Sequence, residues 1–165
     1  MKTATKTRIL FAVFLLFAAT LWSVASAAEY EALKGVKSAK AVFDFRIGQP
    51  QSAALHLKLI HQTYKDLMTA NKKPEVVVVF IGPAVKLISK NREGFAPEDQ
   101  KSLDGIASTV SAMSKDGIGL EICMVAVKVL NVDPASVLAE IKKVENGYIS
   151  IIGYQAQGYS LVPVY

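Results

Sequence analysis

The chain contains a single cysteine, Cys123, within the stretch GIGLEICMVAVKVLNV at residues 117–132. A cysteine thiolate is a nucleophile that exchanges sulfur with disulfides and persulfides. Because the chain holds no second cysteine, Cys123 cannot close an internal disulfide. A structural role is the alternative, since cysteine is often buried and Ile122, Met124 and Val125 beside it are apolar. The residues alone leave both roles open.

Other residues with reactive side chains are placed less favourably for chemistry. His56 and His61 lie five positions apart on one predicted helix, so they do not share a face as a metal-binding pair would, and we expect structural or surface roles. The chain has no H-E-x-x-H, C-x-x-C or G-x-S-x-G pattern, and Gly117 and Gly119 precede a strand instead of opening a helix. We therefore predict no metal and no cofactor. Tyrosines near the end of the chain suit the core or an interface better than a reactive pocket: Tyr148, Tyr154, Tyr159 and Tyr165.

The elements that position Cys123 follow from the alternation of apolar runs with amphipathic stretches. Residues 76–81 form a continuous β-branched run, which is typical of a strand buried on both faces of a parallel sheet. We predict strands at residues 40–47, 76–81, 118–123, 141–144 and 159–164. We predict helices at residues 52–70, 84–89, 97–116, 124–130, 135–140 and 148–157. This order predicts an α/β fold, a three-layer α/β/α sandwich with a mainly parallel five-stranded sheet.

The carboxyl ends of the predicted strands define the candidate site. In open α/β sheets, ligands bind outside these ends. Cys123 ends the third strand, Gly82 follows the second, and Asn146 and Gly147 follow the fourth. We predict Cys123 as the catalytic residue, and Asn146, Gly147 and Gly82 as substrate-binding residues. Glu121 precedes Cys123 by two positions and is expected on the same side of the strand.

The first residues have the pattern of an export signal. Lys2, Lys6 and Arg8 precede an apolar run at residues 9–22, and residues 25–27 read Ala-Ser-Ala, a small-x-small cleavage pattern. We predict a signal peptide at residues 1–27, cleavage after its last residue, and a single domain at residues 28–165 that is periplasmic or secreted. The apolar run is short for a bilayer, so an uncleaved anchor is the less favoured alternative, and no stable membrane insertion is expected after cleavage.

The charge balance excludes one class of partner. The whole chain has a formal net charge of +5 at pH 7, but Lys2, Lys6 and Arg8 belong to the predicted signal, which contains no acidic residue. The remaining chain is therefore closer to neutral. It has no basic stripe with interleaved aromatic residues, and we predict no nucleic-acid binding.

Three stretches of the chain resemble a known family. They are VVVVFIGPAVKLI at residues 76–88, the strand that ends in Cys123 with its apolar helix and the Val-Asp-Pro turn at residues 132–134, and NGYISIIGYQAQGYSLVP at residues 146–163. With these stretches the chain resembles the DsrE/DsrF-like family, small α/β proteins associated with sulfur oxidation and sulfur relay. The matching positions in the third stretch are Gly147, Gln155, Gly158, Tyr159 and Pro163.

The resemblance implies a parallel five-stranded sheet, homo-oligomers such as trimers or hexamers, and sulfur carried on a cysteine that matches Cys123. It also implies a sulfane-sulfur donor, either polysulfide or a partner's persulfide, and an acceptor thiol. The chain departs from many relatives with Met124 and Val125 in place of Asn-Thr, and with Ile81 in place of His, which makes the surroundings of the thiol more apolar.

These observations favour a sulfur carrier or a transferase-like protein over a classical enzyme. The alternative is a non-catalytic oligomeric module that binds a small ligand or a partner at the same edge of the sheet. In that alternative Cys123 is a buried structural residue.

Overall fold

The computed structural model describes residues 30–165, so the predicted signal peptide at residues 1–27 lies outside the described residues. The chain divides into two units, Met1–Lys34 and Gly35–Tyr165. The described part of the first unit contains one 3-10 turn, Glu31–Leu33. The second unit holds all the strands and α-helices of the described chain. Within residues 30–165, none of the helices combines the length and the apolar character needed to cross a membrane.

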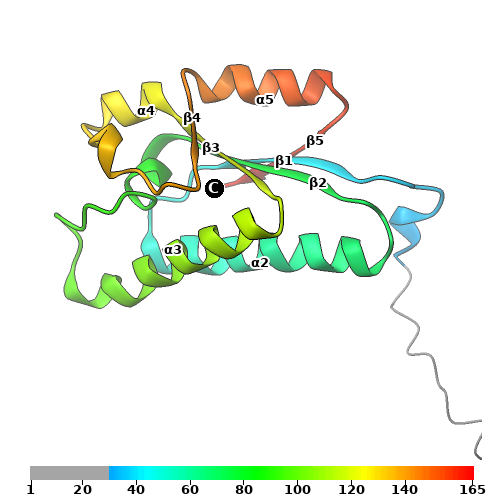
Figure 1. Cartoon of the computed structure of the whole chain (residues 1–165), viewed down its shortest axis with the longest axis horizontal. Coiled ribbons are helices and arrows are strands. Elements are labelled where there is room, and N and C mark those ends of the chain that lie inside the picture. The colour runs from blue at the N-terminus through cyan, green and yellow to red at the C-terminus, as the bar shows by residue number, and fades with distance from the viewer. Residues whose placement is uncertain (1–29) are drawn as a thin grey trace, which may run out of the picture. The chain divides into compact units, whose positions relative to one another are not determined.

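A five-stranded sheet forms the centre of the Gly35–Tyr165 unit (Figure 1). Its strands are β1 (Lys40–Phe45), β2 (Glu75–Phe80), β3 (Gly119–Cys123), β4 (Lys142–Val144) and β5 (Ser160–Val164). They lie in the order β4-β3-β2-β1-β5, and every pairing is parallel. The β-branched run of β2 occupies the central strand, where both faces are covered. The predicted parallel sheet is confirmed.

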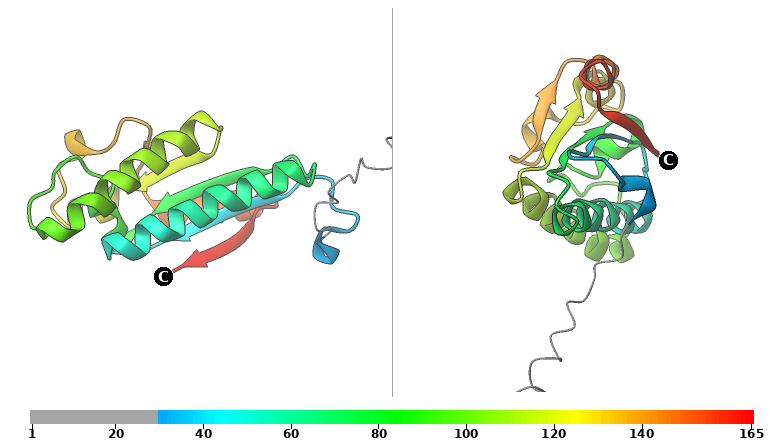
Figure 2. Two further views of the ribbon diagram at one scale, coloured as in Figure 1. Left: turned by 90° about the horizontal axis from the view of Figure 1, so that it is seen from below. Right: turned by 90° about the vertical axis from the view of Figure 1, so that its right-hand side faces the viewer.

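Helices cover both faces of this sheet. Helices α2 (Pro50–Thr69) and α3 (Gln100–Lys115) lie on one face, while α4 (Met124–Val129) and α5 (Gly147–Ala156) lie on the other (Figures 1 and 2). The residues of α2 and α3 that are buried repeat at spacings of three and four, because only one side of each helix faces the sheet. The predicted three-layer α/β sandwich is therefore confirmed.

Two predicted helices have a different structure. The helix predicted at residues 84–89 is a 3-10 helix, η2 (Gly82–Lys86), and the helix predicted at residues 135–140 is wrong except for a 3-10 turn, η4 (Pro134–Ser136). After η4 the chain is extended and pairs with residues 88–89. Val137 forms an antiparallel bridge with Ser89, and the amide of Leu138 donates to the carbonyl of Ile88 at 3.0 Å. These long-range bonds replace the helical ones, which a local pattern does not predict.

Candidate functional site

Cys123 is the last residue of β3, and α4 begins at the next residue, as the sequence predicts. The cysteine is 2% exposed and its thiol is free. Its strand pairs with β4 at this position, where Cys123 lies opposite Val144. The only cysteine of the chain therefore lies at the carboxyl edge of the sheet, where each strand is followed by a helix or a loop. It is buried beneath the surface there.

The first turn of α5 covers Cys123 at very close range. A Cβ atom built on Gly147 would lie 2.9 Å from Ile81 Cδ1 and 3.0 Å from Cys123 Cβ. Glycine is thus the residue that lets α5 approach the ends of β2 and β3 so closely. The loop before α5 is tied down as well, because the amide of Val125 donates to the carbonyl of Glu145 at 3.2 Å.

The other predicted site residues lie near this contact. The side-chain oxygen of Asn146 accepts from the amide of Tyr148 at 3.0 Å and caps α5. Gly82 has a φ of 59°, a left-handed conformation that turns the chain from β2 into η2. The structure brings Gly147 into contact range of Cys123, and the residue at that contact from the end of β2 is Ile81, directly after the strand, instead of Gly82.

Arg46, which sequence reasoning missed, anchors the first turn of α5 to the end of β1. Its Nε and Nη2 atoms donate to the carboxylate of Asp44 at 2.8 Å, and Nη1 donates to the hydroxyl of Tyr148 at 2.9 Å. The rings of Tyr148 and Tyr165 lie 4.9 and 5.7 Å from the guanidinium carbon. Asp44 is 4% exposed, and its hydrogen bonds raise the pKa of Arg46 further above the ordinary value. The signal in the sequence was a pair of opposite charges, Asp44 and Arg46, two residues apart in an otherwise apolar segment, where both side chains point to the same face of a strand.

A second tyrosine joins the other half of α5 to the sheet. The hydroxyl of Tyr154 donates to Oε1 of Glu121 at 3.0 Å, and Lys142 Nζ lies 3.5 Å from the same oxygen. Burial, followed by the charge of Glu121, raises the pKa of Tyr154 to about 12. Glu121 is 4% exposed, and its second oxygen has no hydrogen-bond partner among the described residues.

One of the two histidines joins two helices, and the other makes a contact within its own helix. His61 Nε2 lies 2.6 Å from Oδ2 of Asp116, just after α3, and so joins α2 to the end of α3. His56 Nδ1 lies 2.9 Å from the carbonyl oxygen of Ser52 in its own helix. Across residues 30–165 there is no group of three or more His, Cys, Asp or Glu side chains suited to a metal ion.

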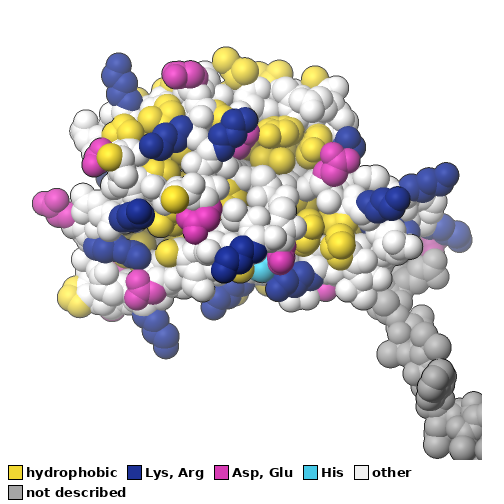
Figure 3. Space-filling view, in the orientation of Figure 1, with side chains coloured by type: hydrophobic (Ala, Val, Ile, Leu, Met, Phe, Trp, Pro, Cys, Tyr) yellow, Lys and Arg dark blue, Asp and Glu magenta, His cyan; other side chains and the backbone are white. Residues whose placement is uncertain are grey.

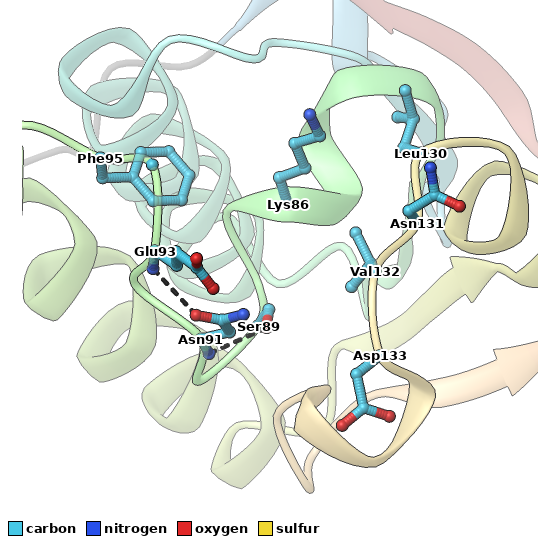
Figure 4. Close-up of a pocket in the computed structure, with 10 residues that line it drawn as sticks. Lys86, Ser89, Asn91, Glu93, Phe95, Leu130, Asn131, Val132 and Asp133 are labelled. Atoms are coloured by element: carbon cyan, nitrogen blue, oxygen red, sulfur yellow. Dashed lines mark hydrogen bonds between the residues drawn. The ribbon is translucent and has the colours of Figure 1, made fainter.

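A polar cavity of about 250 Å³ lies at the carboxyl ends of η2 and α4 (Figure 4). Two segments far apart in sequence form it, and they are held together by a 2.6 Å hydrogen bond between the hydroxyls of Ser89 and Ser136. Cys123 does not line the cavity. The cavity was not predicted, because its walls meet only in the fold. The lining residues are Lys86, Ser89, Asn91, Glu93, Gly94, Phe95, Leu130, Asn131, Val132 and Asp133.

Comparison with known proteins identifies a matching family and one related sequence. The model of the DsrE/DsrF-like family matches residues 40–164. An uncharacterized protein from Aquifex aeolicus (strain VF5) is 25% identical over 128 residues, which cover 75% of this chain and 55% of that protein. This chain therefore spans about half the length of that relative.

Two solved structures share the fold. A protein of unknown function from Methanobacterium thermoautotrophicum aligns with a TM-score of 0.60 at 16% identity, over 76% of this chain and 99% of that chain. The ychN protein from E. coli aligns with a TM-score of 0.50 at 11% identity, over 77% of this chain and 99% of that chain. At these identities the likeness concerns the fold alone.

Proposed function

Because the chain belongs to the DsrE/DsrF-like family, we propose that it carries sulfane sulfur as a persulfide on Cys123. The family supports a role related to sulfur relay in general. The observation that carries the specific proposal is the place of the only cysteine. It ends β3 at the carboxyl edge of a parallel sheet, where α/β proteins bind their ligands.

The proposed chemistry is a thiol exchange with two steps. The Cys123 thiolate attacks the outer sulfur of a donor persulfide, R–S–SH. A new S–S bond forms, the donor's S–S bond breaks, and RS⁻ leaves with the electron pair. An acceptor thiolate then attacks the outer sulfur of Cys–S–SH and releases the Cys123 thiolate. With no second cysteine in the chain, the persulfide is not resolved into an internal disulfide.

Three predicted residues are proposed to bind the transferred sulfur. Gly147 lies closest, since a Cβ at its position would be 3.0 Å from that of Cys123. Asn146 uses its side-chain oxygen to cap α5, which leaves the amide nitrogen as its hydrogen-bond donor. Gly82 would present its backbone from the turn after β2. In this proposal the three residues stabilise the negative charge of the persulfide.

Intact mass spectrometry of the purified protein tests the carrier function. After exposure to polysulfide we expect additions in steps of one sulfur atom, reversed by a reductant and absent from Cys123→Ser. An unchanged wild-type mass, with the protein folded, would refute the proposal. Loading that persists in Cys123→Ser would show that another group carries the sulfur.

The rival function is a non-catalytic module that binds a small ligand, with Cys123 structural. Two observations favour it, the 2% exposure of Cys123 and the separate polar cavity. The cavity offers side chains of both charges, Lys86 and Glu93 from one segment of its wall and Asp133 from the other, with Phe95 as an apolar residue (Figure 4). This lining suits a small zwitterion such as an amino acid.

Backbone amide spectra recorded during titration with amino acids, simple carboxylates and simple amines test that rival. The ligand-binding module predicts saturable shifts confined to residues 86–95 and 130–133, which are lost in Lys86→Met. The absence of saturable shifts with all three probes would eliminate this cavity as the ligand site.

The cellular setting is also a proposal. We propose that the mature chain begins at Ala28, is periplasmic or secreted, receives sulfur from polysulfide or a donor protein, and acts as a homo-oligomer, either a trimer or a hexamer. The mass of the protein recovered from the periplasm checks the first point, since it would correspond to residues 28–165. Recovery of the whole chain in the cytoplasm would contradict export.

A further inference from the structure

Two side-chain hydrogen bonds join helix α5 to the sheet, and each pairs a tyrosine of the helix with a charged side chain in a strand or directly after one. Tyr154 donates to Glu121 of β3, in the second half of the helix. Tyr148 accepts from Arg46, directly after β1, in the first turn. The outward side chains Ile149 and Ile152 are exposed, so they add little packing within this unit. The position of the first turn therefore depends on the Tyr148 contact, on its inner face and on the bond between Val125 and Glu145 just before the helix.

The Tyr148 contact lies beside the residue that covers the thiol. Gly147 precedes Tyr148 and closes over Cys123. Arg46 is itself held in position, because two of its nitrogens donate to the buried carboxylate of Asp44 at 2.8 Å. A hydrogen bond to a charged group and a guanidinium over an aromatic ring both hold more strongly than a neutral contact. The end of β1 thus holds the cover of Cys123 in place.

The two tyrosine contacts differ in how readily they break. Tyr148 is 51% exposed, so water can take the place of its partner once the bond breaks, and no buried group is left unpaired. Tyr154 is half-buried and bonds to Glu121, which is 4% exposed, so loss of that bond leaves a buried carboxylate with only Lys142, at 3.5 Å, as its partner. The Tyr148 bond is therefore the less costly of the two to break, while the Tyr154 bond fixes the second half of α5 more firmly to the sheet.

We propose that Arg46 and Tyr148 form a latch that holds the first turn of α5 closed over Cys123. With the latch closed, the thiol is 2% exposed and a reagent in solution does not reach it. With the latch open, Gly147 moves off Ile81 and Cys123, and the thiol is accessible. A role of this latch in sulfur exchange rests on the proposed function, whereas its control of access to the Cys123 thiol does not.

The rate at which a maleimide alkylates Cys123 in the native protein tests the latch, with intact mass as the readout. We expect Tyr148→Ala to raise the rate by about tenfold, because one charge-assisted bond and one ring contact are lost. Tyr148→Phe keeps the ring over Arg46 and should give a smaller increase. Tyr165→Ala is the matched control, since its ring also contacts Arg46 but lies outside α5. It should stay within about twofold of the wild type.

The dependence of the rate on urea separates a latch from general destabilisation. Local opening exposes little surface, so the alkylation rate of Tyr148→Ala should barely change at low urea concentrations. A rate that rises steeply with urea would mean that Cys123 is reached through global unfolding, and would overturn the latch. An alkylation rate equal to that of the wild type would also overturn it.

Polysulfide loading of the same variants keeps the latch and the proposed function distinguishable. Faster alkylation together with faster loading in Tyr148→Ala supports both. Faster alkylation with no loading in any variant supports the latch and refutes the sulfur carrier. Loading at the wild-type rate despite faster alkylation would show that opening does not limit exchange, which overturns the regulatory role.

Discussion

At the scale of single residues, the site depends on the absence of a side chain at Gly147. The nearest atoms to a Cβ at that position would be Cδ1 and Cγ1 of Ile81, both at 2.9 Å, and Cβ of Cys123 at 3.0 Å. Such distances are shorter than carbon atoms tolerate without displacement. The contact of Gly147 with Ile81 and Cys123 therefore both encloses the thiol and positions α5 on the sheet.

Gly147→Ala is expected to destabilise the protein by about 1–3 kcal/mol, because the added methyl overpacks this contact. Gly153→Ala is the matched control in the same helix, since a Cβ there meets no atom within 4 Å. It should raise the free energy of unfolding by up to about 1 kcal/mol through helix propensity. Urea denaturation measures both. Equal gains in stability from the two substitutions would contradict the close contact.

At the scale of elements, α5 is coupled to the sheet by the buried bond between Tyr154 and Glu121. Burial, with the neighbouring carboxylate, raises the pKa of Tyr154 to about 12. A tyrosine in an unfolded chain titrates near about 10. Between these values the unfolded chain has lost a proton that the folded chain retains. The contribution of the protonated Tyr154 to the free energy of unfolding is complete below about pH 10, and it is lost as the pH rises toward about 12.

Tyr154→Phe should therefore flatten the fall in stability above about pH 10. Urea midpoints for the wild type and the variant across this range measure the difference, with the midpoints at pH 7 as the baseline. Some fall should remain in the variant, because burial and then Glu75 raise the pKa of Tyr159 as well. Parallel curves for the two proteins above pH 10 would show that Tyr154 does not titrate in this way.

At the scale of the whole molecule, helices α4 and α5 present apolar side chains to solvent. Figure 3 shows hydrophobic side chains gathered along the edge that these helices form. The residues are exposed on two helices of one face, which is typical of a surface that another protein covers. They are Val125 and Val129 of α4, and Ile149 and Ile152 of α5.

We expect the proposed homo-oligomer to be held together through this face. Ile149→Lys combined with Ile152→Lys should reduce the mass in solution to that of one chain, because two charges cannot be buried unpaired. The matched control is Leu55→Lys combined with Leu59→Lys, which alters two exposed leucines of α2 on the opposite face. Light scattering after size-exclusion chromatography measures the masses. An oligomer that survives the α5 double substitution would contradict this interface.

The sequence by itself determined the fold class and the place of the cysteine. The β-branched run of β2 and the spacing of apolar residues in α2 and α3 are local patterns, and both are present in the structure. Such patterns are readable because each element must bury one face or both. The position of Cys123 at the end of β3 followed from the same reasoning, since strand ends converge on one edge in a parallel sheet.

The tertiary structure alone decided what surrounds that cysteine and where the separate cavity forms. Gly147 over Cys123, Arg46 against Tyr148 and the cavity near Lys86 all join segments that are distant in the chain. The false helix at residues 135–140 has the same origin, because long-range bonds there outweigh local propensity. A pattern along the chain records which face of an element is buried. Which atoms meet across that face depends on how closely the elements pack, and only the assembled fold sets that distance.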